Sequence, residues 1–499
     1  MKKIKFAPLI LILSLIQLNN FLFAAIVDTP EASLSPAQRE WLIDNQAHAK
    51  KLYISEIDKA TDKEIPAYNA AFISYSEKDF RETDKYLNLA LNSNPKYGPA
   101  LLLKARIEYD RKNLTNCFKH LKKAIKYHPF PEIPNYYCGK YLYERNKYKD
   151  AIDYLKDAIS DNKLYTFSYP ILGDIYLRHG EIDDAIKILE KGLKYSYDAE
   201  ILYQLAHAYK ISGQKNRAVK YFGLFSYLYP QHPNIGKVMD YLTENSIKNI
   251  FTNGFEPIPE RDESSRFFPV GENVLYSVHW GIIRVGELNT EIVDTLIYKG
   301  HEAYKVRFSL DSNPALEFVA SLHSDYITII DQRTKQTYRH YLHIRENRII
   351  AEKVYDYDRV NNIFKCRIIR EDGHIDYLEK YLPRNTIDGT SILFYSRQVV
   401  KERRTELVLT TIDETFVITE IKFNNVKDPI MIRDKEELAF RISGENRYKG
   451  IVGFTGKFRG WFRDDSSYTP LGSDFEIWVG RIGINMATEE EQQLHKYAR

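Results

Sequence analysis

The stretch TFSYPILGDIYLRHGEIDDAIKILEKGLKYSYD, residues 166–198, sets the pattern for much of this chain. Apolar and small residues recur in it at helical spacing, and Gly180 separates two amphipathic segments. Its Ala185, Leu189 and Gly192 have counterparts upstream at intervals of 34 residues. The stretch therefore predicts one unit of a repeat, built from two helices and a short turn.

The same period organises residues 64–232. It defines units at 64–97, 98–131, 132–165, 166–198 and 199–232. A single helix pair cannot bury its apolar faces alone, so neighbouring units must stack. A small residue recurs where two helix backbones approach, because a larger one would cost about 1–3 kcal/mol there. The small residues of one such position are Ala90, Ala124, Ala158 and Gly192, with Phe225 one shortened period later.

The pattern resembles the tetratricopeptide repeat. The small residues of both helices, the apolar partner and the closing prolines Pro95, Pro129 and Pro230 fall at that family's spacing. Two positions depart from it, since Ser74 replaces a preferred tyrosine and Lys163 a closing proline. The resemblance implies a helical solenoid that binds a protein or peptide partner in its concave groove.

Composition limits the class of protein. With 499 residues, the chain is long enough for two or three domains, and 44% hydrophobic and 28% charged residues are typical of a globular protein. A net charge of +3 gives no reason to expect nucleic acid as a partner. Three cysteines without a CxxC pair predict unpaired structural thiols rather than a disulfide framework or a metal site.

The N-terminus is typical of an export signal. Lys2, Lys3 and Lys5 precede an apolar run, and small residues follow at Ala24 and Ala25. We expect a signal peptide at 1–25 that is cleaved near Ala25, and a mature chain in the periplasm or otherwise exported. An uncleaved anchor is the alternative.

Short segments flank the repeats. Helical patterns predict a capping helix at 35–62, with Ser35 as N-cap, and a second capping helix at 233–250. Asn253-Gly254, Pro257 and Pro259 predict a linker at 251–266.

Period-two alternation replaces the helical period after the linker, as in Val274, Tyr276 and Val278. Residues 267–487 therefore predict a mainly antiparallel β domain, a curved sheet or open barrel with a helix inserted at 388–400, and 488–499 a polar tail. The fold class expected for the whole chain is multidomain α + β, an α-solenoid followed by this β domain.

This second half is similar to a bacterial envelope family catalogued only as domain of unknown function 3108. The similarity rests on motifs in order along 268–486: Val270-Gly271-Glu272, Trp280-Gly281, Tyr355-Asp356-Tyr357-Asp358-Arg359, the helix residues Asp388, Ser391 and Arg397, and Lys457-Phe458-Arg459-Gly460-Trp461. It implies an exported β fold and no established activity.

The first helix of each tetratricopeptide unit lines the concave groove. Its expected groove positions carry aromatic side chains interleaved with basic ones, which suit a peptide or helix with acidic groups; packing between repeats is the alternative interpretation. The candidate partner-binding residues are Tyr68, Phe72, Tyr75, Arg106, Tyr109, Tyr136, Lys140, Tyr143, Tyr203 and His207.

No motif for catalysis, metal or cofactor is found. His340 and His343 are three apart and should point to opposite faces of a strand. Lys457 is followed by Phe458, so the nearby glycines do not form a phosphate loop. Asp388 and Ser391 suit the start of a helix, and no histidine is paired with Ser391.

The sequence thus predicts a non-enzymatic exported scaffold without a cofactor. Its array would recruit a protein or peptide partner, and its β domain would contact an envelope component. The alternative is that the β domain carries or senses a lipid or glycan, with the repeats as an assembly arm. Trp280, Phe308, Phe318, Phe394 and Trp461 would then line its cavity.

Overall fold

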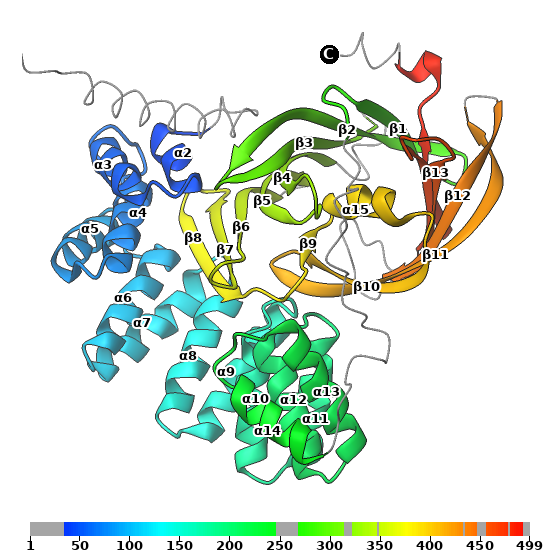
Figure 1. Cartoon of the computed structure of the whole chain (residues 1–499). Coiled ribbons are helices and arrows are strands. Elements are labelled where there is room, and N and C mark those ends of the chain that lie inside the picture. The colour runs from blue at the N-terminus through cyan, green and yellow to red at the C-terminus, as the bar shows by residue number, and fades with distance from the viewer. Residues whose placement is uncertain are drawn as a thin grey trace, which may run out of the picture.

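The computed structural model describes residues 34–245, 268–313, 322–346, 349–432, 435–446, 456–477 and 480–492. The signal peptide predicted at 1–25, the linker at 251–266 and most of the polar tail lie outside these residues. Figure 1 shows a curved array of helices that runs along one side of a large curled sheet and beneath it.

The array consists of paired helices, as the 34-residue period predicts. Each predicted unit of 64–232 forms one helical hairpin. The helices are α4 Glu64–Ser76 and α5 Phe80–Ser93, α6 Gly98–Asp110 and α7 Leu114–Tyr127, α8 Glu132–Glu144 and α9 Tyr148–Asp161, α10 Ser168–Arg178 and α11 Ile182–Leu193, and α12 Ala199–Ile211 and α13 Lys215–Leu228.

The small residues mark close approaches between helices. A Cβ added to Gly173 of α10 would lie 2.7 Å from the side chain of Leu189 on α11. The same addition to Gly139 of α8 would lie 2.6 Å from Leu155 on α9. Both leucines are fully buried, so a larger residue at either glycine would overpack the hairpin.

The N-terminal segment differs from the single capping helix predicted at 35–62. It forms two helices, α2 Pro36–Leu42 and α3 Gln46–Glu56. Ser35 caps α2 with a capping box, as expected of this residue. Asp44 has a φ of 71°, in the left-handed region, and this conformation ends α2 and reverses the chain direction. At the other end, α14 Ile235–Glu244 follows the last repeat and buries Val238 and Leu242.

Fifteen strands form one sheet in the described residues. Its order is β8-β7-β6-β5-β4-β3-β2-β1-β15-β14-β13-β12-β11-β10-β9, so the sheet is curved and not closed. Neighbours are antiparallel except β9 and β10, which are parallel. The strands are β1 Asn273–Trp280, β2 Ile283–Tyr298, β3 His301–Ser312, β4 Leu322–Asp331, β5 Thr337–Glu346, β6 Ile349–Asp358, β7 Ile363–Arg370, β8 Ile375–Tyr381, β9 Ile387–Asp388, β10 Arg403–Ile412, β11 Thr415–Ile432, β12 Lys435–Asn446, β13 Gly456–Arg463, β14 Pro470–Ile477 and β15 Gly480–Met486.

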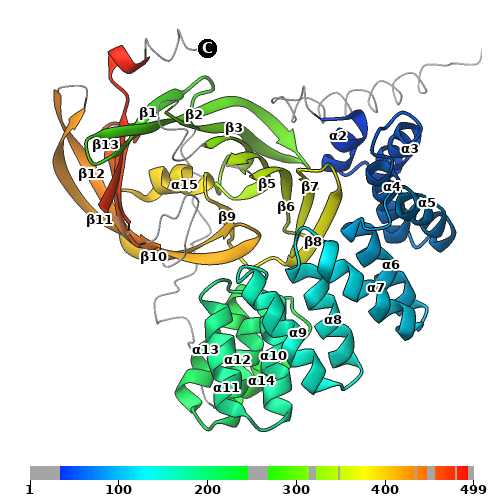
Figure 2. The ribbon, with the colours of Figure 1, turned by 180° about the vertical axis from the view of Figure 1, so that it is seen from behind.

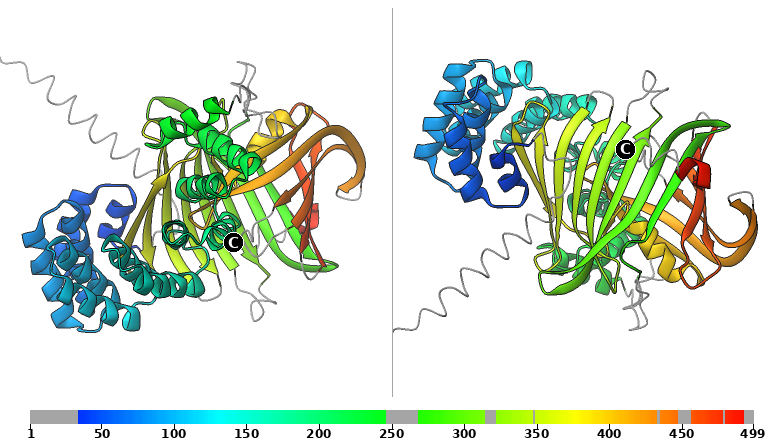
Figure 3. Two further views of the ribbon diagram at one scale, coloured as in Figure 1. Left: turned by 90° about the horizontal axis from the view of Figure 1, so that it is seen from below. Right: turned by 90° about the horizontal axis from the view of Figure 1, so that it is seen from above.

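The inserted helix is α15 Ser391–Val399, within the predicted segment 388–400. It lies inside the curl of the sheet, as Figure 3 shows. Phe394 packs with Ile330 and other residues of β2–β4, whereas Tyr395 packs with Val408 and other residues of β10–β13. The helix therefore fills the space that the curled sheet encloses.

The array and the sheet share their hydrophobic core. One cluster of buried side chains includes Leu155 and Leu189 of the array together with Phe364 and Phe416 of the sheet. A second cluster joins Tyr68 of the array with residues of β4–β8. Seen from behind, in Figure 2, the array passes along β7 and β8 and continues beneath β10.

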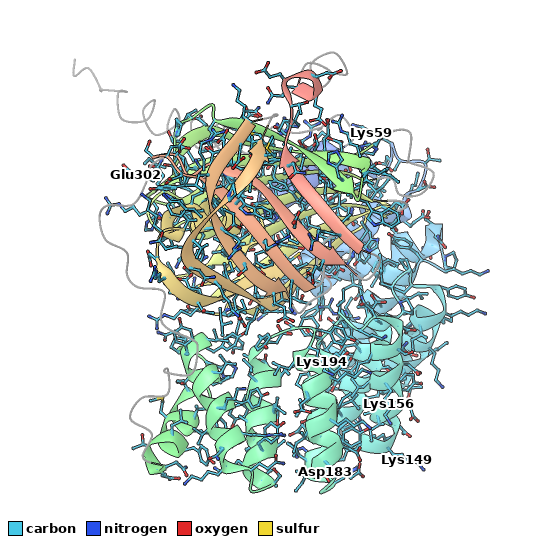
Figure 4. All side chains as sticks on the ribbon, turned by 90° about the vertical axis from the view of Figure 1, so that its right-hand side faces the viewer. Lys59, Lys149, Lys156, Asp183, Lys194 and Glu302 are labelled. Carbon is cyan, nitrogen blue, oxygen red and sulfur yellow. The ribbon has the colours of Figure 1, made fainter. Side chains whose placement is uncertain are left out.

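Three first helices, α4, α6 and α8, carry residues that face the sheet, such as Tyr68, Arg106 and Tyr136. Lys149 of α9 and Asp183 of α11 belong to second helices, and Figure 4 shows both at the end of the array away from the sheet. The concave face that sequence reasoning assigned to a partner is therefore directed toward the chain's own β domain.

Candidate functional site

The first contact between array and sheet lies at the turn between β7 and β8. Asn69 of α4 is fully buried; its side chain donates to Gly373 O (3.0 Å) and accepts from Ile375 N (3.0 Å). The Tyr97 hydroxyl donates to the Asp372 carboxylate (3.2 Å). These bonds hold the turn against the first repeat.

The second contact lies at the other end of the array. The Ser196 hydroxyl accepts from Phe416 N (3.0 Å), and Tyr197 N donates to Phe416 O (2.8 Å). The Lys380 ammonium of β8 donates to Asp198 (3.2 Å) and to the carbonyl oxygen of Glu414 (2.9 Å). The loop before α12 is thereby attached to the β10–β11 hairpin and to β8.

A cavity of about 920 Å³ lies between these two contacts. Helices α4, α6 and α8 and the loop before α10 form one wall, and strands β3–β8 with the β10–β11 turn form the other. Its size is within the range of pockets that bind small ligands. The site is therefore composite, because neither half of the chain would enclose it alone.

The array wall is aromatic with one cation among the rings. The Arg106 guanidinium lies 4.9 Å from the Tyr75 ring centre and 5.1 Å from that of Tyr137. The rings of Tyr136 and Tyr137 are 5.3 Å apart, and Tyr165 continues the series 5.5 Å from Tyr136. This wall offers flat apolar faces with hydroxyl groups at their rims.

The sheet wall carries paired charges. Lys353 of β6 lies 2.7 Å from Glu414, and Arg370 of β7 lies 2.9 Å from Asp376 of β8. Burial would lower the pKa of Lys353, but the Glu414 carboxylate outweighs it and raises that pKa. Burial would raise the pKa of Glu414, but the Lys353 ammonium outweighs this effect and lowers that pKa. Both groups are therefore charged at neutral pH.

Two adjacent residues of the β10–β11 turn have unusual backbone geometry at this wall. Asp413 has a φ of 45° and Glu414 a φ of 59°. Turns of this kind favour asparagine and glycine, so two acidic residues here carry backbone strain. Burial raises the pKa of the Asp413 carboxyl; the Lys353 ammonium opposes this rise and the Glu414 carboxylate adds to it. Strain and a perturbed carboxyl group coincide at the cavity.

The candidate groove residues divide into two groups. The structure brings five of them together at the cavity: Tyr68, Phe72, Tyr75, Arg106 and Tyr136. Tyr68 and Phe72 are buried at the first contact, and the Tyr68 ring lies edge-on to His374 at 5.8 Å. The other five, which do not line the cavity, are Tyr109, Lys140, Tyr143, Tyr203 and His207.

Three of the tyrosines connect successive repeats. The hydroxyl of Tyr75 donates to Asp110 (2.7 Å), that of Tyr109 to Glu144 (2.5 Å) and that of Tyr143 to Asp174 (2.5 Å). Each carboxylate belongs to the first helix of the next repeat. The regular return of tyrosine at this position thus has a packing role.

The remaining candidates lie along the same face. Lys140 is 4.0 Å from Glu144. Tyr203 packs on Phe225 with ring centres 5.6 Å apart, and its ring stacks near that of His207 at 6.3 Å. Burial lowers the pKa of His207. These three do not join the composite site.

The aromatic residues proposed to line a cavity within the β domain do not do so together. Phe308 lines the composite cavity, whereas Phe394 is buried against Phe268. Trp461 packs in another cluster, with β1 and β14 residues, and Trp280 is 44% exposed. Phe318 lies outside the described residues.

The polar residues at the start of α15 form a closed cluster. The Asp388 carboxylate accepts from Thr390 N (2.7 Å) and Ser391 N (3.2 Å), as the helix-start interpretation predicts. The Ser391 hydroxyl is fully buried and donates to Asp388. His340 lies 3.5 Å from Asp388 and bonds to Thr328. Ser391 is thus held by a carboxylate rather than presented to a base.

In the described part of the chain, no group of three histidine, cysteine, aspartate or glutamate side chains is placed so that it could hold a metal ion. His343 bonds to Glu352, away from the partners of His340. Cys117, Cys138 and Cys366 are buried and unpaired. Among the helices that the structure describes, none has the length and apolarity needed to cross a bilayer.

Sequence reasoning missed the sheet wall of the cavity. Lys353, Arg370, Lys380 and Glu414 come from strands and turns far apart in the chain, so no local motif joins them. One sequence signal for this wall was available. Asp413-Glu414 separates two β-branched runs by two residues, and this pattern predicts a tight hairpin with an acidic turn.

Comparison with known families supports both halves of this description. Residues 275–487 match the model of the family described as "Protein of unknown function (DUF3108)". Residues 199–232, which form α12 and α13, match a tetratricopeptide repeat model. The chain combines tetratricopeptide repeats with a domain that resembles the DUF3108 family. A search of curated proteins found no match.

Solved structures resemble the array. PilW, a type IV pilus biogenesis factor, is 17% identical, with a TM-score of 0.37 over 41% of this chain and 94% of its own. Pseudomonas aeruginosa PilF is 16% identical, with a TM-score of 0.37 over 42% and 94%. YrrB, described as having an unusual peptide-binding site, is 16% identical, with a TM-score of 0.32 over 40% and 100%. Likeness of this degree carries no argument about function.

Proposed function

We propose that this protein is a non-catalytic binding protein of the cell envelope whose repeats and β domain act as one receptor. A small ligand occupies the cavity between them. The observation that carries the proposal is the composite cavity of about 920 Å³, with an aromatic wall from the array and a charged wall from the sheet.

The arrangement favours a small ligand over an extended peptide along the array. The sheet contacts the array at Asn69 and again at Ser196 and Tyr197, on either side of the cavity. A peptide that followed the concave face from end to end would have to displace both contacts. Ligand binding would instead stabilise the two halves against each other, so that the protein could report occupancy to a partner.

A protein partner of the array remains part of the proposal. Repeats of this kind are interaction scaffolds, and the starts of the second helices α9 and α11, marked by Lys149 and Asp183 in Figure 4, lie away from the sheet. The apolar side chains Ile211 and Met239, at the C-terminal end of the array, are 47% and 46% exposed. Recruitment through this part of the molecule is compatible with an occupied cavity, and export remains an expectation from the N-terminal sequence.

Native mass spectrometry of the full chain, purified without denaturant, tests the ligand proposal. We expect a bound mass that is lost on denaturation. Replacement of Leu102, which lines the cavity, in the variant Leu102→Trp should fill space and abolish the adduct. The control Leu89→Trp changes a residue of α5 that is 39% exposed, and should keep it. Absence of any adduct from the wild type, or its retention in Leu102→Trp, would count against the proposal.

A further inference from the structure

The cations of the cavity are not equivalent. Lys353 pairs with Glu414 at 2.7 Å, Arg370 with Asp376 at 2.9 Å and Lys380 with Asp198 at 3.2 Å. Arg106 has no carboxylate within 4.0 Å among the residues that the structure describes; the two tyrosine rings beside it provide its closest charge-stabilising contacts. Its guanidinium therefore keeps hydrogen-bond donors for another group.

The position of Arg106 is fixed by the fold. It lies in the middle of α6, and the rings of Tyr75 from α4 and Tyr137 from α8 flank it. The Tyr75 hydroxyl already donates to Asp110, which keeps that carboxylate engaged. A guanidinium held between two rings is oriented before a ligand arrives, and its planar fork suits a carboxylate or phosphate.

The residues around Arg106 indicate what kind of molecule carries this carboxylate or phosphate. A sugar ring has an apolar C–H face that packs on an aromatic ring and a rim of hydroxyl groups that need hydrogen-bond partners. The tyrosines of the array supply such faces. The carboxylates and ammonium groups of the opposite wall, such as Glu414 and Lys353, supply donors and acceptors for hydroxyls. An acyl chain offers no hydrogen-bond partner for the donors and acceptors that these paired groups have left.

We infer that the cavity binds an anionic saccharide whose carboxylate or phosphate is received by Arg106, with its sugar rings on the tyrosines beside it. This inference rests on the proposed function and names the ligand class of the same site. Carboxylate and phosphate share the chemistry that Arg106 recognises, and the experiment separates them.

Isothermal titration of the full chain with four probes tests the inference. The probes are a galacturonic acid tetrasaccharide, glucose 1-phosphate, a neutral galactose tetrasaccharide and a tetraglutamate peptide. We expect one of the two anionic sugars to bind at least about tenfold tighter than the neutral sugar, since hydrogen bonds between charged groups are stronger than neutral ones. Which sugar binds identifies the anion.

Two variants test whether Arg106 is responsible for the preference for the anionic sugar. Arg106→Met keeps the apolar stem between the rings and should reduce affinity for the anionic sugar about tenfold or more, to the level of the neutral one. Arg111→Met is the control, because Arg111 directly follows the same helix as its C-cap residue, lies outside the cavity and pairs with Asp84. Its affinity should equal that of the wild type.

The outcomes separate this inference from the proposed function. Binding of neither anionic sugar, preference for the peptide or the neutral sugar, or an unchanged preference in Arg106→Met would overturn the inference. In each of these cases the proposed function still stands if the purified chain carries a ligand that Leu102→Trp abolishes.

Discussion

Asp356 of β6 is buried between two arginines of neighbouring strands. Arg339 of β5 donates to it at 2.6 Å, and Arg367 of β7 donates to its other oxygen. Arg367 also donates to Leu42 O (3.1 Å) and pairs with Asp44 (2.9 Å), both near the end of α2. One buried carboxylate thus supports the contact between the N-terminal helices and the sheet.

This cluster predicts an acid-sensitive contribution to stability. Burial would raise the pKa of Asp356, but Arg339 and Arg367 outweigh it, and the folded pKa lies below its usual value. The stabilisation is therefore present above the unfolded pKa of about 3.9 and is lost as pH falls through the folded pKa. Asp356→Asn should lower the free energy of unfolding by about 3–5 kcal/mol at pH 7, because two buried arginines lose the carboxylate that they share.

Urea unfolding at pH 7 and pH 3 measures this effect. The difference between wild type and Asp356→Asn should shrink at the lower pH. Asp325→Asn is the control, since Asp325 pairs with Arg307 at 3.1 Å at a half-buried site and should lose at most about 1 kcal/mol. Equal losses in the two variants, or a difference independent of pH, would contradict the assignment.

At the scale of single residues, sequence reasoning succeeded where a local contact determines which residue size fits. The recurrence of small residues in both helices was predicted from spacing alone, and at Gly139 and Gly173 the small residue meets a leucine of its own hairpin. The tyrosine positions left two interpretations open, ligand contact or packing between repeats. Tyr75 does both, since it bonds to Asp110 and also lines the cavity.

The β7–β8 turn is an element held from outside its own sheet. Asn69 of α4 completes hydrogen bonds with both Gly373 and Ile375, and Gly373 has a φ of 89°. Asn69→Leu would leave a buried carbonyl and a buried N–H group without partners. We expect a loss of about 1–3 kcal/mol and faster hydrogen exchange of the peptide that spans the turn.

Hydrogen-exchange mass spectrometry and urea unfolding check this prediction together. The control Asn116→Leu alters an exposed position of α7 and should change stability by no more than about 0.5 kcal/mol. Unchanged exchange at the turn in Asn69→Leu would show that the contact does not hold this element.

Elements differ in how much of them the sequence predicts. The helical hairpins follow from a local period, so their bounds agree closely with the structure. The single helix expected at 35–62 was wrong because Asp44 adopts a left-handed conformation without glycine. Strands β8 and β12, with the sequences IDYLEKY and KEELAFRISGEN, are rich in charged residues, so their strand signal is weaker than that of the β-branched runs.

The relation between the two halves was beyond sequence reasoning altogether. Contacts such as Asn69 with Ile375 or Ser196 with Phe416 join residues more than two hundred positions apart. Periodicity reports which face of a helix is apolar and not what covers it. The aromatic face of the array was predicted to bind a partner or to pack between repeats, and the structure shows the chain's own sheet opposite part of it.

The shared core predicts that the whole molecule behaves as one cooperative unit. Because cluster residues such as Leu155 and Phe416 come from both halves, separation would expose apolar surface on each.

A protease site inserted in the predicted linker at 251–266 should therefore be cut without release of either half. The cleaved chain should elute with the intact chain on size exclusion, and should unfold in urea in one transition by circular dichroism and by tryptophan fluorescence. Trp41 of α2 and Trp461 of β13 provide probes in the two halves, each used in a variant whose other tryptophans are replaced by phenylalanine. Halves that elute apart, or transitions that do not coincide between the two probes, would mean that the array is an independent arm and that the composite cavity does not persist in solution.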